Sequence, residues 1–266
     1  MKINMSQIEN KHVMEQATVI SQERISTGIY SMWIACDLAK YAKPGQFVSL
    51  YSGNGAHLLP RPISICEIKE DKTALRLVYR VVGAGTDEFS KLQSEDKIKV
   101  LGPLGNGYTL KNKKAILAAG GIGVPPIVEL AKTLKKEFNC ELNIVVGYRS
   151  KLFLYEELKQ YGNVYVSTED GNFGTKGNIM NAIAEHDIQG DIIYACGPMP
   201  MLRALKAYAE EHDIEAQISL EERMACGIGA CLGCVCKTKE KDHHTNVNNT
   251  RICTDGPVFD ARDVEI

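Results

Sequence analysis

Four cysteines near the C-terminal end restrict how the last part of the chain can fold. Cys226, Cys231, Cys234 and Cys253 follow the spacing C-x4-C-x2-C-x18-C, and the first three lie in a glycine-rich run, residues 224–236. Glycines stand between these thiols, where the chain must wrap tightly and turn backbone N–H groups toward sulfur. This is the ligand spacing of a plant-type 2Fe-2S cluster, so we predict a centre that passes single electrons.

Two other fates for these thiols stay open on the spacing alone. A four-cysteine zinc site also uses C-x2-C pairs, but it usually has two of them and this chain has one. The thiols could also be unligated. Cys236 falls outside the spacing, and we expect it to point away from the cluster, because it would crowd the same iron. We expect Cys36, Cys66, Cys140 and Cys196 to be core residues, since each has apolar neighbours.

The length of 266 residues leaves room for two domains and a small appendage, and the formal net charge is −2. Such a charge gives no basic surface of the kind that binds nucleic acid. The first residues contain no apolar signal core, and the most apolar stretch, residues 115–128, is too short to cross a bilayer. We expect a soluble, cytoplasmic protein whose nine cysteines are metal ligands and buried thiols rather than disulfides.

The first half of the chain has the pattern of a small antiparallel β-barrel. Short segments rich in β-branched and aromatic residues alternate with Gly, Pro, Asn and Asp. The expected strands are residues 28–35, 46–51, 74–82 and 97–101. We assign residues 1–110 to this barrel.

From Lys114 onward, strands alternate with helices, which implies a parallel sheet with helices on both faces. The expected strands are residues 115–119, 142–146, 164–167, 191–195 and 217–220. One helix is expected to begin near Pro125, and three more are expected over residues 155–161, 177–185 and 199–212. We assign residues 111–220 to this α/β domain. Residues 221–266 form a third, small domain with the cysteines, in which residues 237–250 are predicted to be an exposed loop.

Two segments of the barrel half place an arginine beside residues that shape the backbone. In residues 61–64, Pro62 fixes the backbone, Arg61 can meet a phosphate and Ser64 can hydrogen-bond a flavin edge, with a strand expected to follow. In residues 79–86, a second arginine precedes a turn at Gly85 and Thr86 whose N–H groups could hold a pyrophosphate. Residues 102–108 then form an irregular glycine loop between the two domains. All these segments also fit ordinary hairpin turns.

Two strand-to-helix junctions of the second half carry Gly and Pro at the carboxyl ends of strands, where ligands bind in open α/β sheets. The first junction, residues 120–126, departs from G-x-G-x-x-G because Pro126 takes the third glycine position. The next strand also ends at Arg149 without an acidic residue, so a standard Rossmann dehydrogenase is disfavoured. We expect these junctions to bind NAD through Gly120, Gly121, Gly123, Cys196, Gly197 and Pro198.

An acidic pair, Glu169 and Asp170, ends a further strand of the same sheet. These carboxylates could hold ribose hydroxyls and would repel a 2′-phosphate, which favours NAD over NADP. A solvated turn explains the pair equally well, because acidic turns are common.

The order of R-P-x-S, G-G-x-G-x-x-P and C-G-P-x-P-M is similar to that of the ferredoxin-NADP reductase superfamily. With the cysteine motif added, nearly the whole chain resembles the electron transfer subunits of class 1B dihydroorotate dehydrogenases. The long loop with His243 and His244 departs from this pattern, and its role is open. The resemblance implies that Cys226, Cys231, Cys234 and Cys253 hold the cluster and that FAD is bound by Arg61, Pro62, Ile63, Ser64, Val78, Tyr79, Arg80, Gly85 and Thr86.

The resemblance further implies a function in pyrimidine biosynthesis. Electrons would pass from the FMN of a separate catalytic subunit through the 2Fe-2S cluster and FAD to NAD+, in a heterotetramer of two of each subunit. This chain has no room for the roughly 250-residue (β/α)8 barrel that such a flavin site usually needs, so it is not expected to oxidise dihydroorotate alone. The alternatives are a reductase subunit of an NADH-dependent ferredoxin:NADP oxidoreductase or a sulfhydrogenase, and a zinc-stabilised binding module.

Overall fold

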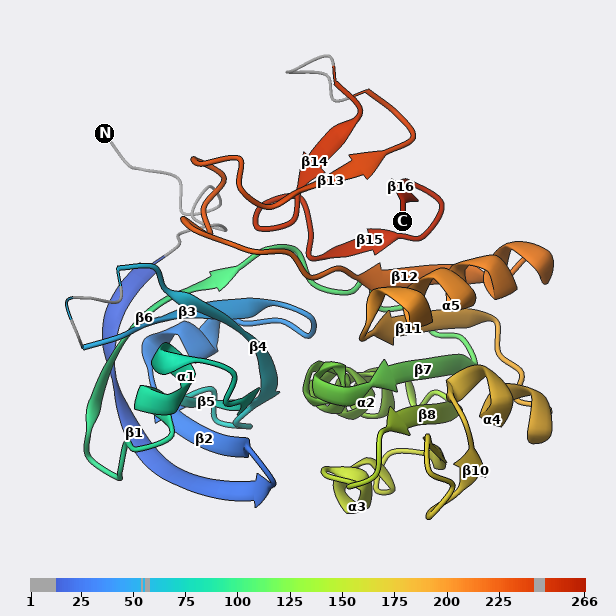
Figure 1. Ribbon diagram of the computed structural model, residues 1–266, viewed down its shortest axis with the longest axis horizontal. Helices are drawn as coiled ribbons and strands as arrows, with labels where there is room; N and C mark the ends of the chain where they lie inside the picture. Colours follow the sequence, from blue (N-terminus) through green and yellow to red (C-terminus); the bar gives the residue numbers. More distant parts are fainter. Residues whose placement is uncertain (1–12, 54, 56–57, 242–246) are drawn as a thin grey trace.

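The computed structural model describes residues 13–53, 55, 58–241 and 247–266. A barrel lies beside a layered α/β part, and a small C-terminal part extends along the top of both in Figure 1. This arrangement confirms the predicted fold class. His243 and His244 lie outside the described residues. Within those ranges, no helix has the length and apolar character needed to cross a membrane.

The barrel is a closed antiparallel sheet in the order β1-β2-β5-β4-β3-β6. Alternate side chains point inward, and the interior is filled by apolar residues such as Val19, Met32, Leu50 and Leu77, none of which is exposed. The strands are β1 (Val13–Ser26), β2 (Ile29–Ala35), β3 (Phe47–Tyr51), β4 (Arg61–Ile68), β5 (Ala74–Arg80) and β6 (Lys97–Leu104). A short helix, α1 (Ala84–Phe89), follows β5.

Three details of the barrel differ from the sequence predictions. The long first strand β1 was not predicted, because its burial pattern shows little regular alternation. Arg61 to Ser64 lie inside strand β4 and do not precede it, since this segment pairs with β3. Gly85 and Thr86 belong to the first turn of α1, where the Thr86 hydroxyl accepts hydrogen bonds from the N–H groups of Val82 and Gly83.

The α/β part is built on one sheet in the order β10-β9-β8-β7-β11-β12-β15. Its parallel strands are β7 (Ala115–Gly120), β8 (Leu142–Tyr148), β9 (Asn163–Thr168), β10 (Thr175–Lys176), β11 (Ile192–Cys196) and β12 (Glu215–Ser219). The helices are α2 (Pro125–Phe138), α3 (Tyr155–Leu158), α4 (Ile179–Glu185) and α5 (Met199–Glu211).

Helices cover both faces of this sheet, as the alternation predicted. Leu117 of β7 packs in the same apolar cluster as Ile127 of α2, on one face. Its neighbour Ile116 points the other way and packs with Ile183 of α4 and Leu205 of α5. Continuous burial on both faces explains why these strands are runs of apolar residues without polar alternation.

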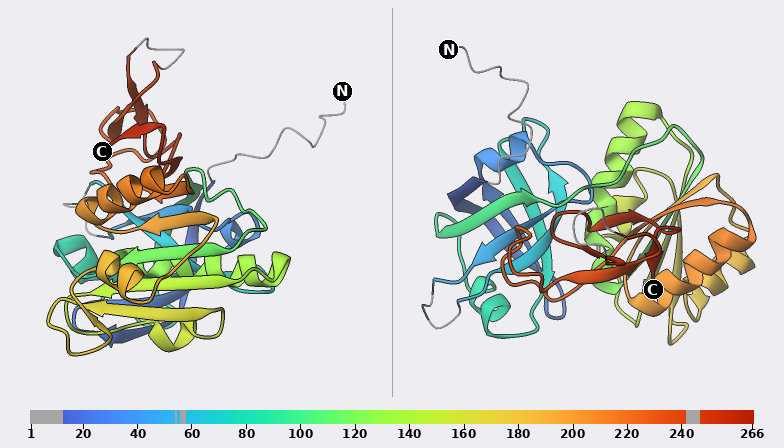
Figure 2. Two further views of the ribbon diagram at one scale, coloured as in Figure 1. Left: turned by 90° about the vertical axis from the view of Figure 1, so that its right-hand side faces the viewer. Right: turned by 90° about the horizontal axis from the view of Figure 1, so that it is seen from above.

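The C-terminal part divides its strands between two sheets. Strands β13 (Val235–Thr238), β14 (Asn249–Arg251) and β16 (Val264–Glu265) form a small sheet of their own. Strand β15 (Val258–Asp260) instead pairs antiparallel with β12 and so extends the α/β sheet. Figure 2 shows this part standing on the edge of the molecule. The predicted loop over residues 237–250 is wrong at both ends, because β13 and β14 pair with each other there.

Ion pairs join the barrel to the α/β part. Arg76 of β5, whose side chain is buried, binds the carboxylate of Glu157 in α3 through two nitrogens. Lys132 of α2 reaches Glu67 of β4 at 3.0 Å. These pairs tie β4 and β5 of the barrel to α2 and α3 of the α/β part.

Candidate functional site

The four predicted cluster ligands come together as two pairs. The backbone N–H of Cys231 donates to Cys226 Sγ at 3.4 Å, and the two thiols lie close to each other. The buried thiols of Cys234 and Cys253 also lie close to each other. Among the described residues no three His, Cys, Asp or Glu side chains are placed to hold one metal ion. Two thiols for each of two metal positions is the arrangement that a 2Fe-2S cluster uses.

Backbone N–H groups point at these sulfurs. Burial opposes ionisation of Cys226, but the N–H groups of Ile228, Cys231 and Ala230 outweigh it and lower the pKa of this thiol to about 7. The N–H of Gly229 donates to Cys253 Sγ at 3.2 Å, although burial raises the pKa of Cys253 to about 12. Such donors stabilise sulfur ligands that carry negative charge, so the loop fits a cluster.

Cys236 is placed differently from these four thiols. It lies on β13 opposite Thr250 and packs against apolar side chains of the core. Burial raises its pKa to about 11. Every cysteine of the chain lies in the described residues and is a free thiol.

The predicted flavin residues form a surface of the barrel around Arg61. The side chain of Arg61 lies directly over Gly85 in the first turn of α1, and its Nη1 donates to the carbonyl of Leu59 at 2.5 Å. Pro62 and Ser64 follow on β4, opposite Ser49 and Phe47 of β3. The structure therefore brings the Arg61 guanidinium and the Gly85 turn together, and such donors fit a pyrophosphate.

The second flavin segment, residues 78–80 on β5, alternates between two environments. Tyr79 points into the barrel, where its hydroxyl donates to Gln22 Oε1 at 2.8 Å, so its side chain is not on the binding face. Val78 is buried in the core that joins the barrel to the α/β part. Arg80 is exposed and reaches toward Gly121, where a Cβ would lie 3.7 Å from its Nη2.

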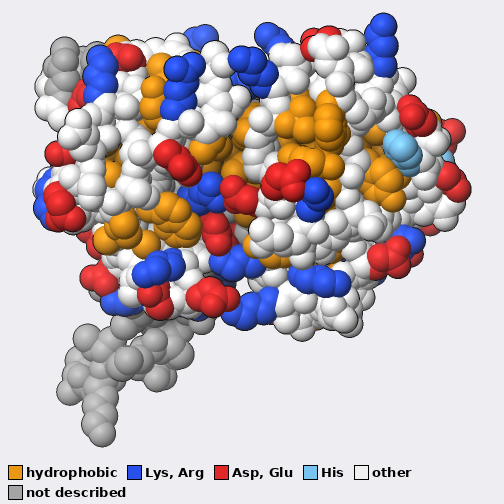
Figure 3. All heavy atoms as spheres, turned by 90° about the horizontal axis from the view of Figure 1, so that it is seen from below, with side chains coloured by type: hydrophobic (Ala, Val, Ile, Leu, Met, Phe, Trp, Pro, Cys, Tyr) orange, Lys and Arg blue, Asp and Glu red, His pale blue; other side chains and the backbone are white. Residues whose placement is uncertain are grey.

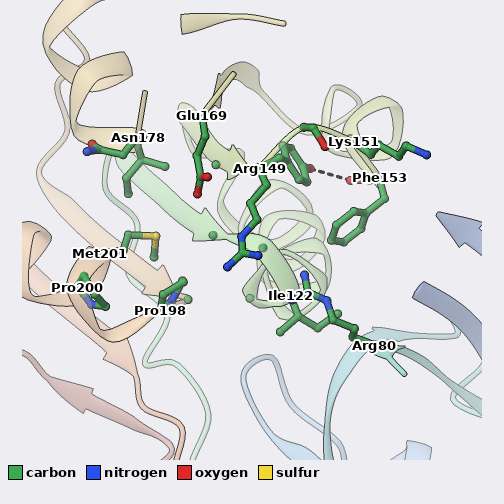
Figure 4. Close-up of a pocket in the computed structure, with 18 of the residues that line it drawn as sticks. Arg80, Ile122, Arg149, Lys151, Phe153, Glu169, Asn178, Pro198, Pro200 and Met201 are labelled. Carbon is green, nitrogen blue, oxygen red and sulfur yellow. Dashed lines mark hydrogen bonds between the residues drawn. The ribbon is translucent and has the colours of Figure 1, made fainter. Parts of the chain in front are cut away.

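A cavity of about 910 Å³ lies between the barrel and the carboxyl ends of the parallel strands. Both glycine junctions line it, the first between β7 and α2 and the second between β11 and α5. Figure 4 shows Ile122, Pro198 and Met201 around its walls. Of the residues predicted for NAD, the cavity is lined by Gly120, Gly121, Gly123, Gly197 and Pro198.

Cys196, the remaining residue of that prediction, is buried at the end of β11 and its side chain does not line the cavity. Its carbonyl oxygen lies against Gly123, where a Cβ would come within 2.3 Å. Gly123 thus permits the close approach of the two junctions, and Cys196 contributes its backbone carbonyl, not its thiol, to this contact.

Charged side chains also line the cavity; Glu169 had been predicted as a contact for ribose hydroxyls, whereas Arg149 and Glu221 had not been predicted to bind. Arg149 and Glu169 follow the neighbouring strands β8 and β9, and in Figure 4 both side chains point into the cavity. Glu221, two residues after the end of β12, lines it too, and desolvation raises the pKa of its carboxyl against the opposing charge of Arg80. A charged residue directly after a strand end was the available signal for Arg149 and Glu169, whereas Glu221 lies one residue further on.

Glu169 and Asp170 have separate environments despite being neighbours. Glu169 lines the cavity, whereas Asp170 accepts a hydrogen bond from the N–H of Asn172 that lowers the pKa of Asp170.

The surface seen from below carries apolar side chains in a central patch bordered by charged ones (Figure 3).

The cluster loop touches the flavin barrel. A Cβ on Gly227 would lie 3.2 Å from Ser49 Oγ, so the loop between the first two cysteines rests on β3. Ser49 pairs with Pro62 of the predicted flavin segment on β4. The cluster loop is therefore separated from that segment by one strand, about 5 Å across.

Comparisons with known proteins agree with this arrangement. Residues 221–265 match the model of the iron-sulfur cluster binding domain of dihydroorotate dehydrogenase B, and residues 117–207 match the oxidoreductase NAD-binding domain. The dihydroorotate dehydrogenase B (NAD(+)) electron transfer subunit of Fusobacterium nucleatum is 44% identical over 265 residues, covering 95% of this chain and 99% of that protein. The subunit of the same name from Streptococcus mutans is 40% identical, covering 93% of this chain and 96% of that protein.

Solved structures show the same fold. An NADH-dependent reduced ferredoxin-NADP oxidoreductase has a TM-score of 0.83 at 27% identity, covering 94% of this chain and 89% of that one. The cytochrome b5 reductase domain of Ulva prolifera nitrate reductase has a TM-score of 0.64 at 16% identity, covering 77% of this chain and 97% of that one, and shows the fold alone.

These matches confirm the predicted electron-transfer function and the cofactor set of FAD, a 2Fe-2S cluster and NAD. They also imply a catalytic subunit as partner, because the relatives are named as one subunit of an enzyme. The chain belongs to the family of dihydroorotate dehydrogenase B (NAD(+)) electron transfer subunits.

Proposed function

We propose that this chain receives single electrons at Cys226, Cys231, Cys234 and Cys253 from the FMN of a dihydroorotate-oxidising subunit and passes them through FAD to NAD+. The observation that carries this proposal is the contact of Gly227 with Ser49, which sets the cysteine loop against the flavin segment of the barrel. Reduction of NAD+ to NADH takes two electrons and one proton, so each NADH requires two single-electron passages. When bound, FAD exchanges electrons singly with the cluster and in pairs, as hydride, with nicotinamide.

The barrel residues bind and orient the flavin in this scheme. The guanidinium of Arg61, held over the α1 turn by the absence of a side chain at Gly85, binds the pyrophosphate. Ser64 and the backbone of residues 78–80 hold the flavin edge, and Thr86 keeps the α1 turn in shape through its bonds to Val82 and Gly83. We assign residues 1–110 to FAD binding.

Residues 111–220 bind the nicotinamide cofactor in the cavity. The two glycine junctions let its backbone approach closely, and Arg80 reaches over them from the barrel, so that both cofactors meet at this boundary. Arg149 binds phosphate, and Glu169 accepts hydrogen bonds from ribose hydroxyls. The carboxylate of Glu169 disfavours a 2′-phosphate, which makes NAD the cofactor.

Residues 221–266 receive the electrons and contact the partner. Cys231 is the exposed member of the four ligands, and large apolar side chains are exposed beside it at Ile228, Leu232 and Val235. Exposed apolar groups around an electron acceptor suit a protein partner that excludes water from the path. By the family resemblance, this partner is the FMN-bearing subunit, in a heterotetramer of two of each. Ligand thiols suit a reducing compartment, so we place the complex in the cytoplasm.

A second candidate follows from the likeness to the NADH-dependent reduced ferredoxin-NADP oxidoreductase, whose structure matches over most of this chain. In that case the chain would be a reductase subunit with a different partner. Purifying the chain with its bound partner from its own cells and identifying that partner separates the two functions.

Anaerobic titration tests the proposed path. With the catalytic subunit present, dihydroorotate should bleach both the flavin and the iron-sulfur absorption, and NAD+ should restore them. The chain alone should respond to NADH but not to dihydroorotate. A chain that is colourless after reconstitution with iron, sulfide and FAD would refute the proposal.

A further inference from the structure

The glycine loop at residues 102–108 contacts the turn that follows the last cluster ligand. Asn106 Nδ2 donates to the carbonyls of Thr254 and Asp255, at 3.0 Å each, and the backbone N–H of Asn106 donates to the carbonyl of Gly256 at 2.6 Å. Asn106 also forms a parallel bridge with Pro257. Asn106, just after the last barrel strand, thus binds a four-residue turn at residues 254–257. This turn begins directly after Cys253 and is almost 150 positions away from Asn106 in sequence.

Glycine is required beside Asn106 for this contact to form. Gly105 has φ +71°, and a Cβ there would lie 2.5 Å from Pro257 Cδ and 2.6 Å from the carbonyl oxygen of Gly256. The carbonyl of Gly105 accepts a hydrogen bond from Gln46 Nε2 at 2.7 Å, which anchors the loop to the barrel. The loop is therefore shaped to receive this turn.

The other side of the turn is tied to the α/β part. The N–H of Leu220 donates to the carbonyl of Pro257 at 2.8 Å, and β15 begins at the next residue. Within the turn, the N–H of Asp255 donates to the carbonyl of Arg251 at 2.8 Å. Cys253 is consequently carried by a segment that is fixed to the flavin barrel through Asn106 and to the nicotinamide sheet through Leu220.

We infer that Asn106 and Gly105 are positioning residues that fix the distance between the cluster and the flavin. Neither is among the residues assigned above to the flavin or to the cluster, and both act through the turn that follows Cys253. This inference rests on the proposed function, because it assumes that electrons pass between the two groups. Single-electron transfer slows steeply as donor and acceptor separate, and small misplacements caused far from a reacting group can cost large factors in rate.

The test uses the full chain loaded with FAD and cluster. Asn106→Ala removes the two side-chain hydrogen bonds, and its control Asn163→Ala removes an amide of the same size at the start of β9. Gly105→Ala forces the turn away, and its control Gly28→Ala has the same left-handed strain, φ +68°, with no atom within 4 Å of the added Cβ. Stopped-flow mixing with NADH follows flavin and cluster absorption separately, and hydrogen exchange follows the backbone amides of Thr254, Asp255, Gly256 and Leu220.

We expect both loop variants to keep FAD and iron and to reduce the flavin at the wild-type rate. Cluster reduction should slow about tenfold relative to flavin reduction. Exchange in the turn should accelerate about tenfold in Asn106→Ala, as expected for the loss of two hydrogen bonds. The two control variants should show neither change.

Three results would count against the inference. Loop variants with the same ratio of cluster to flavin reduction as their controls would overturn it while leaving the proposed function intact. Loss of the cluster from both loop variants would make the loop a folding element and would also overturn a positioning role. A wild-type chain whose cluster NADH cannot reduce would overturn the proposed function itself, and the inference with it.

Discussion

The guanidinium of Arg61 occupies the space that a side chain on Gly85 would fill, since a Cβ at position 85 would lie 2.8 Å from Arg61 Nε. This relationship joins β4 to the first turn of α1 and creates a cationic surface on the barrel. Because the obstacle is the end of a flexible side chain, an added methyl group would displace the guanidinium without unfolding the barrel.

Gly85→Ala should therefore weaken FAD binding by about 10- to 100-fold, the equivalent of one lost charge-assisted hydrogen bond. Folding stability should stay the same or rise, because Ala is a better helix residue than Gly. Equilibrium titration of the deflavinated protein with FAD measures the affinity. Gly83→Ala is the matched control, since its added Cβ meets no atom within 4 Å. Equal FAD affinity in the two variants would remove Arg61 from the pyrophosphate site.

Two cysteine variants test the ligand assignment. Cys231→Ser should lose the 2Fe-2S cluster or bind iron weakly, because its thiol forms one of the two ligand pairs with Cys226. Cys236→Ser should keep iron, because that thiol packs in the core beside β14. Iron and sulfide analysis with absorption spectra measures both. Full iron content in Cys231→Ser would show the assignment to be wrong.

The apolar surface around Cys231 gives a prediction about the partner. Ile228→Asp should weaken the complex with the catalytic subunit at least about tenfold, because a charge would be buried against an apolar surface. Ile20→Asp, on β1, is the matched control, since Ile20 is 44% exposed and Ile228 is 46% exposed. Analytical ultracentrifugation measures the complex, and iron content should stay constant in both. Unchanged affinity for Ile228→Asp would place the partner elsewhere.

Cofactor choice should depend on Glu169 and not on its neighbour. Glu169→Gln should lower the preference for NADH over NADPH, measured as a ratio of kcat/KM, by about tenfold, because one repulsive charge facing a 2′-phosphate is removed. Asp170→Asn should leave the ratio unchanged, since Asp170 is engaged with the N–H of Asn172. The opposite pattern would assign the ribose to Asp170.

A charge cluster at Glu215 predicts a dependence of stability on pH. Burial opposes ionisation of Glu215, but Lys111 and Lys113 outweigh it and lower its pKa below the ordinary 4.5. A group whose pKa is lower in the folded state stabilises the fold above its unfolded pKa and loses that contribution as pH falls through its folded pKa. Glu215→Gln should thus cost about 1 kcal/mol in unfolding free energy at pH 7.

Urea unfolding of both proteins at pH 7 and at pH 4 checks this expectation. The difference between wild type and Glu215→Gln should shrink at the lower pH. Glu141→Gln serves as control, because Glu141 pairs with Lys114 at an exposed position and should matter little at either pH. A gap that widens on acidification would contradict the sign.

The sequence was sufficient wherever the signal was local. The spacing of the cysteines selected Cys226, Cys231, Cys234 and Cys253 as ligands, because the first three lie in one short loop, but it did not predict which thiols lie side by side. The two glycine junctions, after β7 and after β11, were placed correctly because the residues that form a turn between a strand and a helix are adjacent in sequence. The strands β7 and β8 were found because continuous apolar runs report burial on both faces.

The features that could not be predicted from the sequence are contacts between segments that are distant in the chain. Glu169 was predicted as a ribose contact, but its position beside Arg149 in one cavity was not, because that depends on β8 and β9 being neighbours in the sheet and strand order has no local signature. The contact of Asn106 with the turn after Cys253 spans almost 150 positions. Strand β15 has three residues, too few for any periodicity to appear, and its pairing with β12 is set by the route of the chain.

The pairing of β15 with β12 means that the electron-carrying segment also protects the sheet. A parallel sheet that ended at β12 would present a row of unpaired N–H and C=O groups, which is a template for aggregation. The three residues of β15 cover that row with a strand too short to recruit another chain. We therefore expect a chain that cannot assemble its cysteine loop to loosen β15, and so to leave the edge of β12 open to pairing with other chains.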